Sequence, residues 1–195
     1  PHLRQLEYEE VLARIADHGD LLAGLDASDV DPLGTYRSKR NPAKTPEPLP
    51  SASTALTGEG NRFVIQGHRA RRLHYDFRLE RDGVLVSWAV PKNLPESPAE
   101  NHLAVHTEDH PLEYATFEGA IPKGEYGAGK VVVWDSGTYE AEKFNVTRGT
   151  GKKGGEVIVD LHGRRITGRY ALIQTDGDQW LAHRMKDQKV FDFDE

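Results

Sequence analysis

Residues 66–80 read Gln-Gly-His-Arg-Ala-Arg-Arg-Leu-His-Tyr-Asp-Phe-Arg-Leu-Glu, and their second half alternates strictly between apolar and polar side chains. Successive side chains of a strand point to opposite faces, so one face of residues 73–80 is expected to pack a core. The other face presents His74, Asp76 and Arg78 in a row. This row offers two potential metal ligands followed by a bidentate anion clamp. His68 lies near the start of the strand and is placed to be a third ligand.

Length and composition are those of one soluble globular domain with an extension. The chain has 195 residues, of which 37% are hydrophobic and 29% charged. No apolar run is long enough for a membrane helix, and no signal-peptide pattern opens the chain, so we predict a cytoplasmic, nucleoid-associated location without a membrane partner. Because there are no cysteines, a metal has to be bound by histidines and carboxylates.

The net charge of −6 hides a strong asymmetry along the chain. Residues 1–35 hold eight acidic and two basic side chains, whereas residues 36–72 hold eight basic and two acidic ones. A basic segment that runs into a His/Asp/Arg strand fits a polyanionic ligand. A solvated basic loop is the alternative that charge alone leaves open.

Three parts follow from this patterning. In residues 1–35, apolar residues recur at helical spacing between positions 3 and 25, which predicts a short helical, acidic N-terminal extension. Residues 36–60 form a basic leader in which prolines at 42, 46, 48 and 50 exclude a helix or a central strand, and composition alone favours an extended tether. Residues 61–195 read as β structure.

Short alternating runs separated by turn residues predict the β domain. The predicted strands are 63–66, 73–80, 84–90, 102–108, 130–135, 138–144, 155–161, 168–175 and 179–186. Asp82-Gly83 is a typical hairpin turn. The glycine-rich run 119–129 lacks the Gly-Lys-Ser/Thr ending of a phosphate loop and is interpreted as turns. No long helix is visible, so we predict a mainly β fold, a compact antiparallel β-barrel, with a sandwich as the related alternative.

A second polar cluster lies at His106, Glu108 and His110. These residues share parity, so they are expected on one face if the strand continues through them. They are candidates for phosphate binding, general acid catalysis or metal ligation, with a structural role as the alternative. Tyr114 follows as a potential hydrogen-bond donor.

Four segments closely resemble the 3'-phosphoesterase domain of bacterial DNA ligase D. They are 63–80, 83–92 (Gly-Val-Leu-Val-Ser-Trp-Ala-Val-Pro-Lys), 103–114 (Leu-Ala-Val-His-Thr-Glu-Asp-His-Pro-Leu-Glu-Tyr) and 117–129 (Phe-Glu-Gly-Ala-Ile-Pro-Lys-Gly-Glu-Tyr-Gly-Ala-Gly). The likeness extends back to residue 36 and, more loosely, forward to about residue 187. No ligase or polymerase module is present, so the chain is expected to be a stand-alone member.

The resemblance implies a β-barrel and a Mn²⁺-dependent hydrolase that heals DNA 3' ends for non-homologous end joining. The family removes a 3'-terminal ribonucleoside, leaving a 3'-phosphate, and then removes that phosphate to give a 3'-OH. Co²⁺ or Zn²⁺ are alternative cofactors. The implied substrate is a primer-template with a 3'-phosphate or 3'-ribonucleotide, and the implied partners are a Ku-like protein and a DNA ligase.

Position by position, the resemblance also implies roles for individual residues. The implied metal ligands are His68, His74 and Asp76. The implied catalytic residues are Arg78, His110, Tyr114, Arg40 and Glu47. Gln66, Ser87 and Lys92 match further positions around the substrate. Since Arg40 and Glu47 lie in the leader, the resemblance replaces the tether with a segment that contributes to the site.

Two positions depart from the family's pattern. The usual Lys-Arg-Asp-Phe is replaced by Lys-Arg-Asn41-Pro, which leads us to expect a weaker ribonucleoside-removing step. His102 stands where an arginine is common, so a substrate contact there is expected to be weaker or pH-dependent. Both positions are predicted to be near the substrate.

Two other functions fit parts of the pattern. His74, Asp76 and a distal histidine such as His110 match the two-His, one-carboxylate triad of Fe(II) oxygenases. The second is a DNA-end-binding module without catalysis. For the phosphoesterase, we expect Arg78 to clamp a phosphate oxygen, His110 to stabilise the transition state or protonate the leaving oxygen, and water to be the nucleophile.

Overall fold

The computed structural model describes residues 31–50, 60–146 and 154–186. The chain divides into two units, Pro1–Pro32 and Leu33–Glu195, and the strands of the described residues all belong to the second. The helices predicted between residues 3 and 25 lie outside the described residues, and the predicted part boundaries at 35 and 60 stay predictions. Within the described ranges, no helix has the length and hydropathy of a membrane span.

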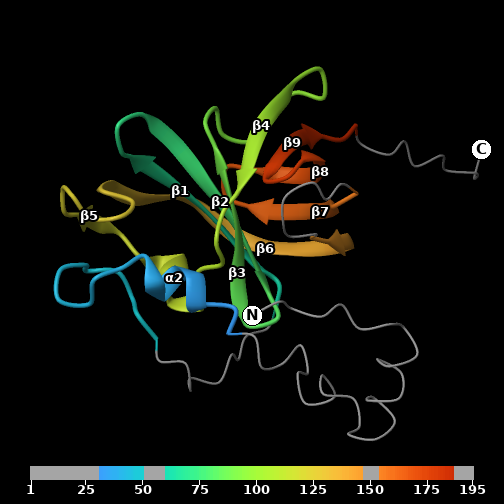
Figure 1. Ribbon diagram of the computed structural model, residues 1–195. Coiled ribbons are helices and arrows are strands. Elements are labelled where there is room, and N and C mark those ends of the chain that lie inside the picture. Colours follow the sequence, from blue (N-terminus) through green and yellow to red (C-terminus); the bar gives the residue numbers. More distant parts are fainter. Residues whose placement is uncertain (1–30, 51–59, 147–153, 187–195) are drawn as a thin grey trace, which may run out of the picture. The chain divides into compact units, whose positions relative to one another are not determined.

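Strands dominate the second unit (Figure 1). The elements in chain order are α2 (Gly34–Ser38), β1 (Arg62–Arg69), β2 (Leu73–Arg81), β3 (Val84–Val90), β4 (Asn101–His106), the 3₁₀ helix η2 (Leu112–Thr116), β5 (Gly119–Ile121), β6 (Gly129–Asn145), β7 (Glu156–Gly163), β8 (Thr167–Asp176) and β9 (Gln179–Arg184).

These strands form a closed, eight-stranded antiparallel barrel. The order is β1-β2-β3-β4-β9-β8-β7-β6, and β1 closes the ring by pairing with β6, while β5 pairs with β6 beside the ring. The hairpin between β2 and β3 turns at Asp82 and Gly83, both with positive φ (49° and 79°), as a two-residue primed turn requires. The predicted barrel and the predicted hairpin are therefore confirmed.

One strand was predicted as two. Residues 130–135 and 138–144 belong to the single strand β6, which passes through Gly137 without turning. A Cβ at Gly137 would lie 2.1 Å from the carbonyl oxygen of His162, so this glycine allows β6 and β7 to approach closely. Gly137 was interpreted from the sequence as part of a turn, but the glycine is there because the two backbones pack closely.

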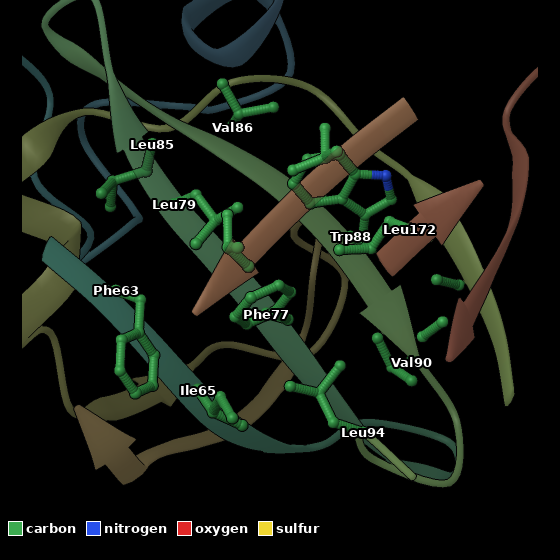
Figure 2. Packing of buried hydrophobic residues seen from close by; sticks show 14 of the residues in the cluster. Phe63, Ile65, Phe77, Leu79, Leu85, Val86, Trp88, Val90, Leu94 and Leu172 are labelled. Carbon is green, nitrogen blue, oxygen red and sulfur yellow. The ribbon is translucent and has the colours of Figure 1, made fainter. Parts of the chain in front are cut away.

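Most of the apolar face of residues 73–80 packs the core of the barrel, as predicted, but Leu73 at the start of β2 is 44% exposed, contrary to the prediction. Phe77 pairs with Trp88 across β2 and β3, both are fully buried, and the Trp88 ring meets Trp180 edge-on at 5.6 Å. Figure 2 shows Ile65, Phe77 and Trp88 among these packed side chains. Burial of such large side chains anchors β2, and its opposite face carries the polar row.

The leader covers that polar face, so the tether that composition favours is wrong. Tyr36 of α2 is fully buried, its hydroxyl donates to the carbonyl oxygen of Pro48 at 2.9 Å, and Leu33 is 2% exposed. The Tyr36 ring contacts those of His110 (5.0 Å) and Tyr114 (6.1 Å). Prolines prevent regular structure here but do not prevent burial of apolar side chains.

His106 and His110 do not share a face, contrary to the parity prediction. β4 ends at His106, which pairs with Trp88, whereas His110 pairs with Leu85. The chain therefore advances four residues from His106 to His110 while β3 advances only three from Trp88 to Leu85. The one extra residue reverses which face of the sheet the following side chains point to. His106 faces the core, where it stacks on Trp88 and Trp180, and His110 joins the polar face.

Candidate metal and phosphate site

A cavity of about 270 Å³ lies over the polar face of β1, β2 and β3, between the leader, η2 and the loop that joins β5 to β6. Its lining is mainly polar and ionisable. The residues are Arg40, Glu47, His68, Ala70, His74, Asp76, Arg78, Ala89, Thr107, Glu108, His110, Tyr114, Ile121, Tyr126 and Gly127.

His68, His74 and Asp76 converge at one end of the cavity, and together they could hold a metal ion. Their nearest ligand atoms all lie within 4.8 Å of one another; Nδ1 of His68 is 3.6 Å and Nε2 of His74 is 3.5 Å from the Asp76 carboxylate. Metal–ligand bonds of about 2.1 Å place neighbouring ligand atoms about 3.0–3.4 Å apart, so a small side-chain movement would complete the set. Two imidazoles and one carboxylate suit Mn²⁺, Co²⁺ or Zn²⁺.

Backbone carbonyl groups aim both imidazoles. Nε2 of His68 lies 2.9 Å from the Gly127 oxygen, and Nδ1 of His74 lies 3.3 Å from the Arg72 oxygen. A carbonyl oxygen only accepts, so these nitrogens carry the ring hydrogens. In the neutral form of each ring, the opposite nitrogen faces Asp76 with its lone pair, which is the arrangement that orients metal-binding histidines.

Asp76 is held in its ionised form. Burial alone would raise the pKa of its carboxyl, but the Arg78 guanidinium and the two histidines outweigh burial and lower the pKa. Nη2 of Arg78 donates to Oδ2 of Asp76 at 3.1 Å. The carboxylate therefore carries its charge at neutral pH, as a metal ligand must.

Arg78 is buried and rigidly placed. Its Nε donates to Oε1 of Gln66 at 2.9 Å, and its Nη1 donates to Oγ of Ser87 at 2.8 Å. Gln66 in turn donates to the carbonyl oxygens of Tyr114 and Phe117. The named bonds use three of the five guanidinium N–H groups, which leaves two for an anion in the cavity.

Arg40 brings a second guanidinium from the leader. Its Nε donates to Oε1 of Glu47 at 2.9 Å, its Nη1 reaches Oε1 of Glu108 at 3.3 Å, and its guanidinium stacks 3.6 Å from the centre of the Tyr36 ring. Glu47 also accepts the Tyr114 hydroxyl at 3.0 Å. These contacts dock the leader and present Arg40 to the same cavity as Arg78.

His110 lies among these charges. Its Nδ1 donates to the carbonyl oxygen of Glu108 at 2.9 Å. Burial, followed by the nearby guanidinium groups of Arg78 and Arg40, holds its pKa well below 6.5. The ring is therefore neutral at pH 7, with the Nε2 lone pair available. Burial raises the pKa of Tyr114, which keeps its hydroxyl protonated as a donor.

The structure brings most of the predicted residues together but not all of them. The metal ligands, Arg78, His110, Tyr114, Arg40 and Glu47 line the cavity, and Gln66 and Ser87 support Arg78 from behind. None of the five predicted substrate-binding positions, which are Gln66, Ser87, Lys92, His102 and Asn41, is among the lining residues. Lys92 follows β3, His102 bonds the Asn93 carbonyl through Nδ1 at 2.7 Å, and Asn41 accepts the N–H of Ala43 in a turn.

Sequence reasoning missed Tyr126 and gave Glu108 no specific partner. Tyr126 lies in the glycine-rich run that was interpreted as turns, and its neighbour Gly127 supplies the carbonyl that orients His68. Burial tends to raise the pKa of Glu108, but its own backbone N–H, Lys39 and Arg40 lower it overall. The available sequence signal for Tyr126 was a polar aromatic residue within a glycine-rich run, between Gly124 and Gly127.

The comparison with known proteins agrees with this geometry. A family model described as DNA Ligase D 3'-phosphoesterase domain matches residues 66–174, which is more than half of the chain. The chain belongs to this family. The matched region contains all three candidate metal ligands as well as Arg78 and His110, whereas the leader lies before it.

Three relatives extend the comparison over the leader. The chain is 68% identical over its full length to multifunctional non-homologous end joining LigD proteins of Mycobacterium bovis and Mycobacterium tuberculosis, and covers 26% of each. It is 44% identical over 84% of its length to the Pseudomonas aeruginosa protein of that name, covering 20% of it. The chain thus spans about a quarter or less of the length of these relatives.

Proposed function

We propose that this protein is a metal-dependent phosphoesterase that heals DNA 3' ends: it removes a 3'-phosphate, and as a second activity a 3'-ribonucleoside, to leave a 3'-OH. The observation that carries the proposal is the convergence, in one cavity, of a two-histidine, one-aspartate group with two guanidinium groups and a neutral histidine. Each of these serves phosphoryl chemistry.

The charge balance of the cavity supports a need for metal. Arg40 and Arg78 face three carboxylates, those of Glu47, Asp76 and Glu108, and Lys39 pairs with Glu108 at 3.1 Å from beside the lining. These charges balance, so they leave no positive excess to offset a phosphate dianion. A divalent metal held by His68, His74 and Asp76 would add positive charge and supply Lewis-acid stabilisation of a phosphate oxygen.

The protein's own groups divide the remaining work. We propose that Arg78 donates its two remaining N–H groups to a phosphate oxygen, because Gln66, Ser87 and Asp76 hold its position before substrate arrives. Arg40 would bind a second oxygen. Neutral His110 would accept a hydrogen bond at Nε2 from the attacking water or from a protonated phosphate.

We propose Mn²⁺ as the cofactor and a DNA primer-template end as the substrate. The donor set suits Mn²⁺ without excluding Co²⁺ or Zn²⁺. The relatives are named for non-homologous end joining, which supports DNA ends as substrate and a Ku-like protein and a ligase as partners. Contacts to backbone phosphates carry little base specificity, so binding should weaken as salt increases.

The test uses two 5'-labelled primer-templates, one ending in a 3'-phosphate and one in a single ribonucleotide. Each is incubated with chelator-treated protein and Mn²⁺. We expect conversion of the 3'-phosphate end to 3'-OH, and its loss in His74→Ala and Asp76→Ala. His162→Ala is the matched control, because that histidine is exposed on β7 and does not line the cavity.

The outcomes separate the alternatives. If only the 3'-phosphate end is converted, the loss of ribonucleoside removal would be attributed to the departure from the family's pattern at Asn41. Binding of both ends without turnover under any divalent ion would favour a non-catalytic module. The Fe(II) oxygenase has less support, because His110, the distal histidine of its triad, is not part of the metal-binding group found among the described residues.

A further inference from the structure

We infer that the ring of Tyr126 is a stacking platform for the base of the 3'-terminal nucleotide, beside the phosphate-binding end of the cavity. The inference rests on the proposed function, since it assigns a place to the nucleoside that carries the phosphate. It adds a nucleobase subsite on the loop between β5 and β6.

The position of Tyr126 places a nucleoside next to the metal group. The adjacent residue Gly127 bonds His68 through its carbonyl oxygen, and consecutive Cα atoms are about 3.8 Å apart. The Tyr126 hydroxyl lies 3.3 Å from Oε2 of Glu108, whose backbone oxygen accepts from His110. The ring therefore belongs to the same cavity as the candidate metal ligands and His110, within reach of one bound nucleotide.

Exposure distinguishes Tyr126 from the other tyrosines of the site. Tyr36 is 0% and Tyr114 is 3% exposed, and both pack against protein groups. Tyr126 is 46% exposed although it lines the cavity. An aromatic ring that remains open to solvent at the mouth of a phosphate cavity has surface available for a base.

The cavity also offers contacts for the apolar part of a nucleotide. Ile121 and Ala70 line it, and a Cβ at Gly127 would lie 3.6 Å from Cδ1 of Ile121 and 4.0 Å from Cε1 of His68. A phosphate bound near the candidate metal ligands would leave its sugar and base to contact these side chains and Tyr126.

Cationic side chains of the leader hold the ring and leave part of it exposed. Lys39 donates to the Tyr126 hydroxyl at 3.2 Å, its ammonium lies 4.6 Å from the ring centre, and the Arg40 guanidinium lies 5.5 Å from that centre. Tyr126 nevertheless stays 46% exposed, so a base has ring surface on which to stack. A ring fixed before binding loses little conformational entropy when a base stacks on it. Stacking accepts any base, which suits an enzyme that treats ends of every sequence.

A bracing role for Tyr126 is the competing explanation, because its hydroxyl joins Lys39 and Glu108. The two roles depend on different parts of the side chain. Bracing requires the hydroxyl, whereas stacking requires the ring and a base opposite it. Tyr126→Phe and Tyr126→Ala separate these parts.

The experiment measures Kd by fluorescence anisotropy and KM with kcat by turnover. The substrates are primer-templates with a 3'-phosphate on either a normal terminal nucleotide or an abasic one. On the normal end we expect Tyr126→Ala to raise Kd and KM about tenfold or more. Tyr126→Phe should retain the greater part of the parent's affinity. On the abasic end the parent should bind as weakly as Tyr126→Ala.

Three results would overturn the inference. One is an equal loss in the phenylalanine and alanine variants, which would indicate bracing through the hydroxyl. Another is a penalty for Tyr126→Ala that persists on the abasic end. The third is an absence of binding to the normal end. Failure of the proposed function is a separate result, because the parent would then bind without turnover and the Kd comparison would still decide the stacking role.

Discussion

His110 shows how a burial site sets the chemistry of one residue. Its ring lies 5.0 Å from that of Tyr36 and 4.8 Å from that of Tyr114, and both neighbouring arginines repel a proton from it. The sequence predicts phosphate binding or general acid catalysis for His110, and that role stays a prediction. In the free protein the ring is neutral, its Nδ1 hydrogen is directed at the backbone oxygen of Glu108, and its Nε2 can accept a hydrogen bond.

The low pKa of His110 predicts a specific pH dependence of stability. The unfolded chain binds this proton near the ordinary pKa of 6.5, and the folded chain does so only at lower pH. The contribution of this group to the free energy of unfolding should therefore be constant above about pH 6.5 and fall below it, by on the order of 1 kcal/mol at pH 5.5. Urea denaturation should show that the free energy of unfolding falls less between pH 7.5 and pH 5.5 in His110→Asn than in the parent protein.

The acidic groups of the site do not contribute to the change in the free energy of unfolding between pH 7.5 and pH 5.5. Asp76 and Glu108 have lowered pKa values, so their contribution to stability is lost only as the pH falls below about 4.5. An equal decline in the parent and His110→Asn between pH 7.5 and 5.5 would show that His110 titrates normally. An NMR titration of the imidazole provides the independent check.

At the scale of elements, the long strand β6 connects the site to the closure of the barrel. Its first half pairs with β1, which carries His68, and its second half pairs with β7. The change of partner occurs around Gly137, which opposes both Phe63 and Gly163. A side chain at this point would separate strands whose pairing closes the ring.

Gly137→Ala should therefore be strongly destabilising. The added Cβ would lie 2.1 Å from the His162 oxygen and 2.8 Å from its carbonyl carbon, and backbone atoms cannot move aside cheaply. We expect a loss of about 3 kcal/mol or more in the free energy of unfolding, measured by urea denaturation.

Gly67→Ala on β1 is the matched control. Its nearest contact would be Cγ2 of Val132 at 3.6 Å, which is an ordinary van der Waals distance. We expect a change of less than about 1 kcal/mol there. Similar losses in both variants would mean that glycine is needed for flexibility in these strands rather than for close approach at Gly137.

At the scale of the whole molecule, a bound metal should stabilise the barrel. The three candidate ligands come from β1 and β2, and the leader and η2 close the cavity above them. A ligand that binds only the folded state raises the free energy of unfolding, by about 2.7 kcal/mol at a hundredfold excess over its Kd. Mn²⁺ added to chelator-treated protein should raise the thermal midpoint by about 5–10 °C.

The test of the metal site is the rise in the thermal unfolding midpoint on addition of Mn²⁺, and not the value of the midpoint itself. His74→Ala should lose the Mn²⁺-dependent increase, whereas His162→Ala should keep it. Mg²⁺ should give a smaller increase, because two imidazole ligands suit transition metals better than Mg²⁺. An increase of the same size in His74→Ala would place the stabilising ion elsewhere on the protein.

Much of the local structure and of the site chemistry was predictable from sequence. The alternation of residues 73–80 determines which face of β2 is apolar, and the Asp82-Gly83 pair determines the hairpin that follows. These features depend on neighbours within a few residues, so period and turn chemistry suffice. The resemblance added the leader residues Arg40 and Glu47, which composition alone had assigned to a tether.

The tertiary structure alone decided how these pieces combine. One extra residue between His106 and His110 sends one histidine to the core and the other to the cavity. The carbonyl groups of Gly127 and Arg72 aim the imidazoles, although a carbonyl is present in every residue and leaves no trace in the sequence. Tyr126 becomes part of the site only because strand pairing brings its loop to His68. Such outcomes depend on contacts between distant segments, which the order of residues does not display.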